Sequence, residues 1–339
     1  MGDEELFKNE IKKGWRDVAA KFGDARRTRI LNISKDDEEP TEIKSLQVSM
    51  TNKNNLFLSE SSTLYTQKRG GVGSKAKLEA GEYVIHTESI ESNEELAFFT
   101  RGGDFYHYPV SALAVGERIA VESLFGLAAH ERIVGLSSFN KRRAKKNIVF
   151  VTKNGIIKKS ELSEYNLKRS GSLRAINLDA NDEIASILFI DEEDVGIMTE
   201  LGNFIRITTS DIRPIGRIAK GVRGIKLNDG DAVCCAYPIP KTTQHIISVT
   251  SSGLFKKTPI SEFTVQGKNT KGAKIHKVND GDRMADFMSL STETEILVAS
   301  TRSTIKISIN DVPTLSRVAQ GAKAIKMNDT DKIVGIALY

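Results

Sequence analysis

The chain has 339 residues, of which 39% are hydrophobic and 27% are charged, and its formal net charge is +5. No apolar run reaches the roughly eighteen residues of a membrane span, and the N-terminal segment is too charged for a secretory signal. Only two cysteines occur, the adjacent Cys234 and Cys235, which argues against a disulfide framework and against a four-ligand zinc site. These features predict an ordinary globular protein of the cytoplasm, without a membrane partner.

The N-terminal segment 1–29 is predicted to be a helical leader. Apolar residues recur there at steps of three to five, as on one side of an α-helix, and Gly23 is a natural stop. The following segment, 30–43, is predicted to be an acidic linker, because four acids at 36–39 precede Pro40, which cannot continue a helix. Residues 1–42 contain nine basic and eleven acidic residues, so the net positive charge lies in the rest of the chain.

The segment 44–339 contains six copies of one motif, in which an apolar residue is followed four places later by an acid and six places later by another apolar residue. The copies are Leu78, Glu82 and Val84; Leu127, Glu131 and Ile133; Leu178, Asp182 and Ile184; Leu227, Asp231 and Val233; Val278, Asp282 and Met284; and Met327, Asp331 and Ile333. The acids are alternately 49 and 51 residues apart. Periods of this size are typical of stacked or radial repeats. With about four short strands per copy, the pattern predicts an all-β fold, a six-bladed propeller-like disc.

Each copy opens with a predicted hairpin. The turns of four hairpins end in Gly103, Gly155, Gly202 and Gly253, where glycine permits the positive φ of a tight turn. The repeated acid usually follows Asn, Asp or Gly, so we expect it to shape a turn and to accept backbone hydrogen bonds. The calcium-loop pattern is absent, and no metal is expected.

No catalytic constellation is visible. The five histidines lie in different copies, and neither a phosphate-binding P-loop nor a G-x-S-x-G elbow occurs. Most acids occupy repeated positions, which indicates an architectural role. The sequence therefore predicts no enzyme activity and no cofactor for this chain on its own.

Positive charge recurs at equivalent places. Aligning the hairpins puts His107, Lys159, Arg206, Lys257 and Lys306 at one position in blades two to six. The loops that follow the hairpins contain Lys68, Arg69, Lys75 and Lys77; Lys168, Arg169 and Arg174; Arg217, Lys220 and Arg223; Lys268, Lys271 and Lys274; and Arg317 and Lys323. In a radial fold equivalent positions lie on a circle, so these cations are predicted to form a belt along one edge. Such a belt suits the phosphates of a bent duplex, whereas the alternative is that each is simply a solvated loop residue.

One heptapeptide in the first blade resembles a known family motif. Gln67, Lys68, Arg69, Gly70, Gly71, Val72 and Gly73 resemble the Q-R/K-R-G-G-R/K-G box of the C-terminal domain of the DNA gyrase A protein. The leader residues 21–28 are similar to the end of that family's breakage-reunion core, and residues 221–227 are similar to its blades. The resemblance implies a six-bladed β-pinwheel, a disc whose strand topology within each blade differs from that of an ordinary propeller. Val72 departs from the pattern, which has a basic residue there, and this predicts weaker binding at the box.

The resemblance also implies a function. A domain of this family binds duplex DNA, largely without sequence preference, and wraps it around its basic perimeter, so that the holoenzyme introduces negative supercoils. The implied partners, at the nucleoid, are the rest of the gyrase A protein and the gyrase B protein; the family holoenzyme uses ATP and Mg²⁺. The DNA-cleaving tyrosine of the family lies upstream of this chain, so the chain would be the non-catalytic part of an ATP-dependent type II topoisomerase. The alternatives are a topoisomerase IV-type domain that selects substrates without strong wrapping, and a propeller that binds proteins.

Overall fold

The computed structural model describes residues 3–23, 43–60, 79, 81–128, 130–138, 145–165, 172–328 and 330–338. Contacts divide the chain into two units, Met1–Glu42 and Ile43–Tyr339. The first unit contains the expected helix, α1 (Asp3–Phe22), whose apolar residues Leu6, Trp15 and Phe22 are exposed. The boundary between leader and linker stays a prediction, because it lies outside the described residues.

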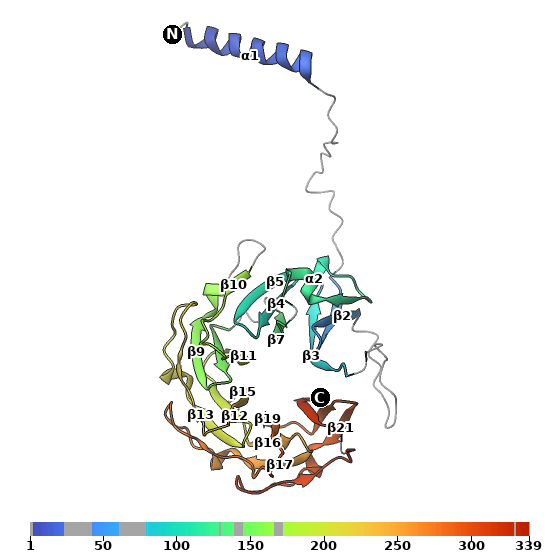
Figure 1. Cartoon of the computed structure of the whole chain (residues 1–339), viewed down its shortest axis with the longest axis vertical. Helices are drawn as coiled ribbons and strands as arrows, with labels where there is room; N and C mark the ends of the chain where they lie inside the picture. Colours follow the sequence, from blue (N-terminus) through green and yellow to red (C-terminus); the bar gives the residue numbers. More distant parts are fainter. Residues whose placement is uncertain are drawn as a thin grey trace. The chain divides into compact units, whose positions relative to one another are not determined.

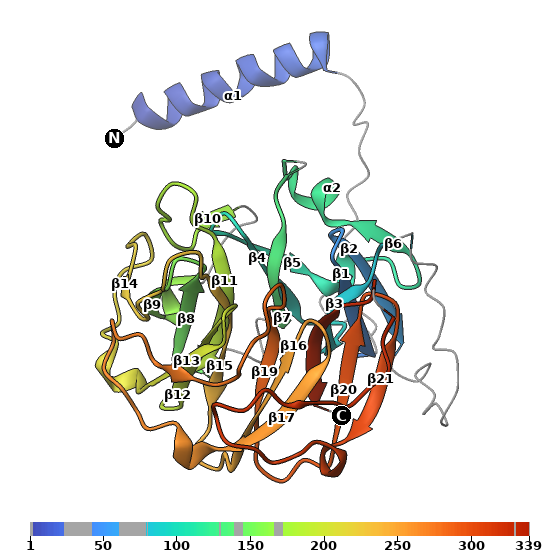
Figure 2. The same ribbon diagram turned by 60° about the horizontal axis from the view of Figure 1, so that its bottom comes forward.

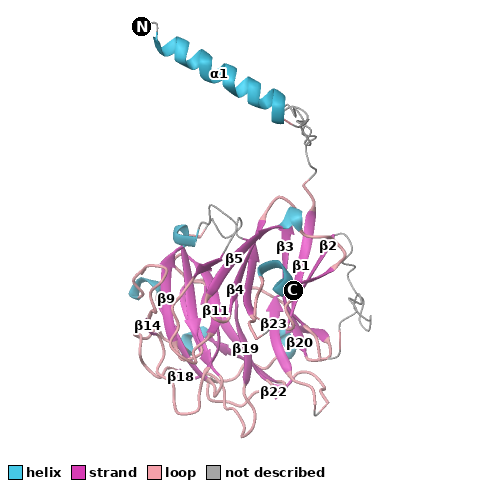
Figure 3. Ribbon diagram, turned by 45° about the horizontal axis from the view of Figure 1, so that its top comes forward, coloured by secondary structure: helices cyan, strands magenta, loops and turns pink. Residues whose placement is uncertain are grey.

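The second unit is a six-bladed β-propeller, as predicted (Figure 1). Each blade contributes three strands of its own: β1 (Ser45–Thr51), β2 (Asn55–Glu60) and β3 (Val84–Glu91) in blade one; β4 (Glu95–Thr100), β5 (Asp104–Pro109) and β7 (Ile133–Ser138) in blade two; β8 (Asn147–Thr152), β9 (Ile156–Glu161) and β11 (Ile184–Ile190) in blade three; β12 (Asp194–Thr199), β13 (Asn203–Ile207) and β15 (Val233–Ile239) in blade four; β16 (His245–Thr250), β17 (Leu254–Pro259) and β19 (Met284–Leu290) in blade five; and β20 (Glu295–Ser300), β21 (Thr304–Ser308) and β23 (Ile333–Leu338) in blade six. The strands dominate the unit, and its helical turns are short (Figure 3).

A fourth, outer strand comes from the next repeat. These strands are β6 (Arg118–Ala120), β10 (Ser172–Arg174), β14 (Val222–Arg223), β18 (Ala273–Lys274) and β22 (Ala322–Lys323). Blade three, for example, has the order β11-β8-β9-β14, in which β14 belongs to the fourth repeat (Figure 2). Within the described residues the sixth sheet has three strands. The borrowed strand and the pairing of β11 with β8 rather than β9 make the blade different from a simple meander, as the pinwheel resemblance implied.

The core lies between neighbouring sheets. The strands β7, β11, β15, β19 and β23 contact one another in sequence around the middle of the ring (Figure 1). Central strands such as β8 and β12 are buried on both faces. One apolar cluster joins Val149 and Val151 of blade three to Ile197 and Ile205 of blade four. Burial on both faces explains why these strands read as continuous apolar runs rather than as an alternation.

In blades two to five the repeated acid closes the hairpin turn of its own blade, as predicted. Its carboxylate accepts a backbone N–H from the turn: Glu131 from Gly102 (3.0 Å), Asp182 from Asn154 (3.0 Å), Asp231 from Leu201 (3.0 Å) and Asp282 from Ser252 (3.1 Å). The turn glycines also have positive φ. At Gly155 φ is +81°, and an added Cβ would lie 2.7 Å from the carbonyl oxygen of Ile225, so only glycine fits.

Candidate nucleic-acid interface

The outer strands place one basic residue at the same point of four successive sheets. Arg174 pairs with Asp104 of β5, Arg223 with Ile156 of β9, Lys274 with Asn203 of β13 and Lys323 with Leu254 of β17. All four basic residues are exposed. Because the borrowed strand is the outermost strand of its sheet, these cations lie on the rim of the ring.

The loops that lead into the outer strands are joined to one another. The backbone N–H of Lys226 donates to the carbonyl of Thr270 (2.8 Å), and that of Asn269 donates to the carbonyl of Gly224 (2.8 Å), which links the loops of blades four and five. The N–H of Lys277 donates to the carbonyl of Ala319 (3.2 Å), which links blades five and six. The basic loops of these three blades therefore form a continuous band.

The band includes three cations that the sequence analysis missed. Lys226, Lys277 and Lys326 each directly precede the apolar anchor of their repeat, and all three are exposed. The signal was present in the sequence as a basic residue in the same column of three successive copies. It adds one cation per blade next to the junctions between the loops.

The predicted loop cations keep most of their charge exposed. Lys268 donates to the carbonyl of Asp211 (2.7 Å) and Lys274 to that of Leu201 (2.7 Å), contacts that hold the side chain without neutralising it. Lys220 is paired with the carboxylate of Asp179. Over the part of the chain that the structure describes, the side chains of Arg223, Lys271 and Lys323 have no hydrogen-bond or ion-pair partner and remain open to a ligand.

The five aligned hairpin residues have different partners from the loop cations. His107 is paired with Glu95 (3.2 Å), Arg206 with Asp194 (2.7 Å) and Lys306 with Glu295 (2.6 Å), each within one blade. Lys159 and Lys257 instead donate to carbonyls of the next blade, those of Thr209 (2.6 Å) and Ile309 (2.9 Å). Lys159 and Lys257 therefore link neighbouring blades, whereas the other three side chains are ion-paired inside their own blade.

Lys159 requires a correction to the predicted belt. Its side chain is buried, and burial lowers the pKa of its ammonium group. The position faces the 3-10 turn Thr209–Asp211 of the next blade rather than solvent, so Lys159 is not a surface cation. Sequence periodicity identifies equivalent positions, but it does not tell whether such a position faces water or a neighbouring blade.

Several predicted residues lie outside the described part of the chain. They are the box residues Gln67, Lys68, Arg69, Gly70, Gly71, Val72 and Gly73, and the loop cations Lys75, Lys77, Lys168 and Arg169. Their contribution to the interface stays a prediction.

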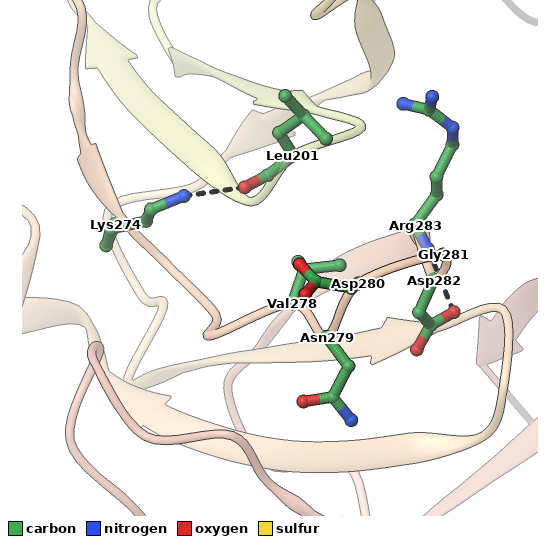
Figure 4. Close-up of a pocket in the computed structure, with 8 residues that line it drawn as sticks. All are labelled: Leu201, Lys274, Val278, Asn279, Asp280, Gly281, Asp282 and Arg283. Atoms are coloured by element: carbon green, nitrogen blue, oxygen red, sulfur yellow. Dashed lines mark hydrogen bonds between the residues drawn. The ribbon is translucent and has the colours of Figure 1, made fainter.

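A pocket of about 350 Å³ opens beside the rim (Figure 4). It is lined by the turn of blade five around Asp280 and Asp282, together with Lys274, Arg283 and Leu201. The carboxylate of Asp282 accepts hydrogen bonds from the hairpin turn of its own blade, and Arg283 is paired with Glu200 (3.1 Å). These lining groups are already used in turns and ion pairs, and they contain no nucleophile next to a base.

Across the described residues, no group of three or more His, Cys, Asp or Glu side chains is arranged to hold a metal ion. In the same residues, no helix is long and apolar enough to cross a membrane.

Fold and rim together define a class, the six-bladed β-propellers that carry a basic rim. The sequence matches the family described as "DNA gyrase C-terminal domain, beta-propeller" over residues 146–191, 194–233, 244–291 and 297–338, just over half of the chain. The chain belongs to this family of DNA gyrase C-terminal domains.

Individual relatives agree with the family. The chain is 31% identical over 350 residues to the DNA gyrase A protein of Helicobacter pylori strain J99, and 28% identical over 344 residues to that of Mycolicibacterium smegmatis. Each alignment includes 98% of this chain but only 42% and 40% of the relative, so the chain spans about two fifths of these proteins.

Two solved structures have the same fold. A DNA gyrase A C-terminal domain superimposes with a TM-score of 0.73 at 20% identity, covering 87% of this chain and 100% of that one. A C-terminal domain of DNA topoisomerase IV superimposes with a TM-score of 0.72 at 18% identity, covering 88% and 94%.

Proposed function

We propose that this chain binds duplex DNA on its rim and wraps it, as the C-terminal domain of a DNA gyrase A protein. The observation that carries the proposal is the band of basic loops, joined by backbone hydrogen bonds from blade four to blade six. DNA would follow this band and then reach the box at 67–73. The curved path bends the duplex, and phosphate contacts at each blade hold it there without reading its sequence.

The free energy of bending DNA favours an interface shared by several blades over a single binding site. Bending 20–30 bp smoothly by 40–90° costs on the order of 1–6 kcal/mol, and a longer wrap costs more. One or two exposed lysines cannot offset this cost, whereas a rim with several cations on each of three or four blades can. Binding should weaken steeply with salt, because each neutralised phosphate releases counterions.

In the intact enzyme the wrap would present a neighbouring DNA segment to the cleaved gate, and strand passage would then introduce negative supercoils. The chain itself supplies no cleavage chemistry in this proposal. Its partners are the rest of the gyrase A protein and the gyrase B protein, in the cytoplasm at the nucleoid.

A topoisomerase IV-type domain is the second candidate. Val72 supports it, because the box lacks one of its usual cations. Such a domain would bind DNA and select substrates without strong wrapping. A propeller that binds proteins is the third candidate, and it predicts that the rim cations are dispensable.

Circle closure separates the three candidates. Nicked plasmid is ligated with increasing amounts of protein, and the linking number of the products is measured. Wrapping predicts a linking-number change of one sign that grows with protein concentration and decreases in the Lys68→Ala, Arg69→Ala variant. DNA binding without a linking-number change supports the topoisomerase IV-type domain. No DNA binding at low salt would refute both DNA-binding candidates.

A further inference from the structure

Two rim loops expose an aliphatic side chain at the same repeat position, among their cations. Ile218 of blade four is 63% exposed and Val318 of blade six is 58% exposed. Arg217 and Lys220 flank the first, and Arg317 precedes the second. Single exposed apolar residues are common on protein surfaces. These two differ in that they occupy the same position of the repeat, two blades apart, within the basic band.

The residue before each aliphatic side chain, Arg217 or Arg317, is held through both its backbone N–H and its carbonyl group. The N–H of Arg217 donates to Glu164 (2.7 Å), and that of Arg317 donates to Glu262 (2.9 Å). The carbonyl of Arg217 accepts a hydrogen bond from the ammonium group of Lys158. The carbonyl of Arg317 accepts the equivalent bond from Lys256 (2.9 Å). The preceding blade therefore clamps both loops, through one acid and one lysine.

Burying the two clamping lysines costs free energy, because a charged side chain loses its hydration. Lys158 and Lys256 are completely buried, and burial lowers the pKa of each to about 8. Fully buried lysines are rare in proteins unless their charge is paired. Lys158 also donates to the carbonyl of Ala175 (2.7 Å), and Lys256 to that of Ser316 (2.7 Å). Each ammonium group is thus committed to carbonyls behind the rim.

The fold does not need lysine at this position. The equivalent hairpin residues are Ile205 in blade four and Ile305 in blade six. Each of these hairpin positions is compared with the rim loop of the next blade. For Ile205 this is the loop of blade five, which has the polar Asn269 where the loops of blades four and six have Ile218 and Val318. In these three loops the buried lysine and the exposed aliphatic residue occur together or not at all. The clamp therefore holds the backbone next to the aliphatic side chain in both loops that have one at this position.

We propose that Ile218 and Val318 contact the minor groove of the duplex as it crosses blades four and six. The inference rests on the proposed function. The minor groove is about 6 Å wide and is bordered by phosphates on both sides, so it suits an aliphatic side chain placed between cations. Proteins that bend DNA often place apolar side chains against or between base steps from this groove. The contact buries apolar surface, and its contribution does not depend on counterion release.

Salt titration distinguishes this contact from the cationic ones. The Ile218→Ser, Val318→Ser variant is compared with wild type by fluorescence anisotropy on a linear duplex over a series of salt concentrations. We expect the dissociation constant to rise about fivefold to thirtyfold at every salt concentration, from the lost apolar burial, with an unchanged slope. The Arg217→Ala, Arg317→Ala variant should instead reduce the slope by about 1.8, the release from two phosphates.

The matched control is Val115→Ser, which changes an equally simple aliphatic residue, 48% exposed, in the loop of blade two. It should bind DNA within about twofold of wild type, because a solvated surface side chain contributes little. Hydroxyl-radical footprinting supplies a second readout: two protected minor-groove segments in wild type should become reactive in the double variant. The double-serine change acts on exposed side chains, so its thermal unfolding should match wild type.

The outcomes are distinct. If the double-serine variant binds with wild-type affinity and footprint, the groove contact is refuted while DNA binding stands. If it keeps DNA binding but loses a protein partner, the two residues belong to a protein interface and the inference is again refuted. If wild type itself does not bind duplex DNA, the proposed function fails first.

Discussion

The rim loops of blades two and four occupy equivalent places but differ in how their charge is used. In blade two, Arg118 lies over the ring of Phe57 and is paired with Glu82 (3.0 Å) and Glu79 (3.2 Å). The short helix α2 (Val121–Phe125) follows, with a further acid, Glu122. In blade four the loop has cations at 217, 220, 223 and 226, of which Lys220 has a carboxylate partner, Asp179.

The difference shows that a sixfold fold does not imply a sixfold interface. Blade two uses its arginine to pair with Glu82 of blade one, whose side chain is completely buried. Blade four leaves its cations at the surface and joins its loop to the next one. In the proposed function the DNA path therefore follows the joined loops of blades four to six, and the rim loop of blade two lies outside it.

Charge reversal should have the largest effect. In the Arg223→Glu, Lys271→Glu, Lys323→Glu variant, one unpaired cation is reversed in each of blades four to six. We expect the DNA dissociation constant at moderate salt to rise about a hundredfold to a thousandfold, since at least three phosphate contacts are lost. Anisotropy titration measures it. The control reverses Lys12, Lys13 and Lys241, which are exposed on α1 and on the turn after β15, and gives the same net charge. Equal loss in the control would mean that net charge, rather than the rim, drives binding.

A pair of single substitutions tests the contrast between the two arginines directly. Arg118→Ala leaves the buried Glu82 carboxylate without its cation, and should lower the free energy of unfolding by about 2–4 kcal/mol. Arg223→Ala should leave stability within about 0.5 kcal/mol but weaken DNA binding and reduce its salt slope by about 0.9. Urea unfolding and anisotropy measure the two quantities. Similar effects of both substitutions on DNA binding would extend the interface to blade two.

The Arg118 prediction has a pH signature. Burial raises the pKa of Glu82, but hydrogen bonds from the Glu79 N–H, Thr51 and Asn55 and the charge of Arg118 together lower it below its usual value of 4.5. The unfolded chain then binds this proton more readily, so the stabilisation is present above pH 4.5 and is lost as the pH falls further. The Arg118→Ala variant should lose less stability than wild type over this acid range.

The buried lysines offer a test of intermediate size. Lys158→Met, Lys256→Met keeps the volume but removes the lysine donors of the buried carbonyls of Arg217 and Arg317, and should lower stability by about 1–3 kcal/mol per site. The folded pKa of about 8 lies below the usual 10.5, so the unfolded chain binds more protons between these values. Wild type should therefore gain stability relative to the variant as the pH rises from 8 to 10.5. Ile205→Met, a swap of similar volume at the equivalent position, should change stability by less than about 1.5 kcal/mol and show no such pH dependence.

The repeat period made most of this fold predictable. The apolar-acid-apolar motif recurs six times and gives the number of blades, while the hairpin glycines and the turn role of the acids recur in four blades; such recurrence is visible in one sequence. The borrowed outer strands were not predictable from local pattern, because Val222–Arg223 is too short for any periodicity. Whether each cation faces solvent or a neighbouring blade was also not predictable from the sequence. Lys158 and Lys159 are neighbours of Arg-rich and Lys-rich loops in the sequence, yet both point into the next blade. Only the packing of two blades decides whether a lysine meets a carbonyl or water.

The smallest effect should come from Asp179 of blade three, whose carboxylate is paired with Lys220 of blade four. Asp179→Ala frees Lys220, whose ion pair is exposed and therefore weak in solution. We expect DNA affinity to rise by less than about threefold, with the increase largest at low salt, where the released charge is least screened. Asp229→Ala, an exposed acid of the neighbouring turn, is the control for the loss of one negative charge. If both substitutions raise affinity equally, the gain reflects net charge, and Lys220 then lies outside the DNA path.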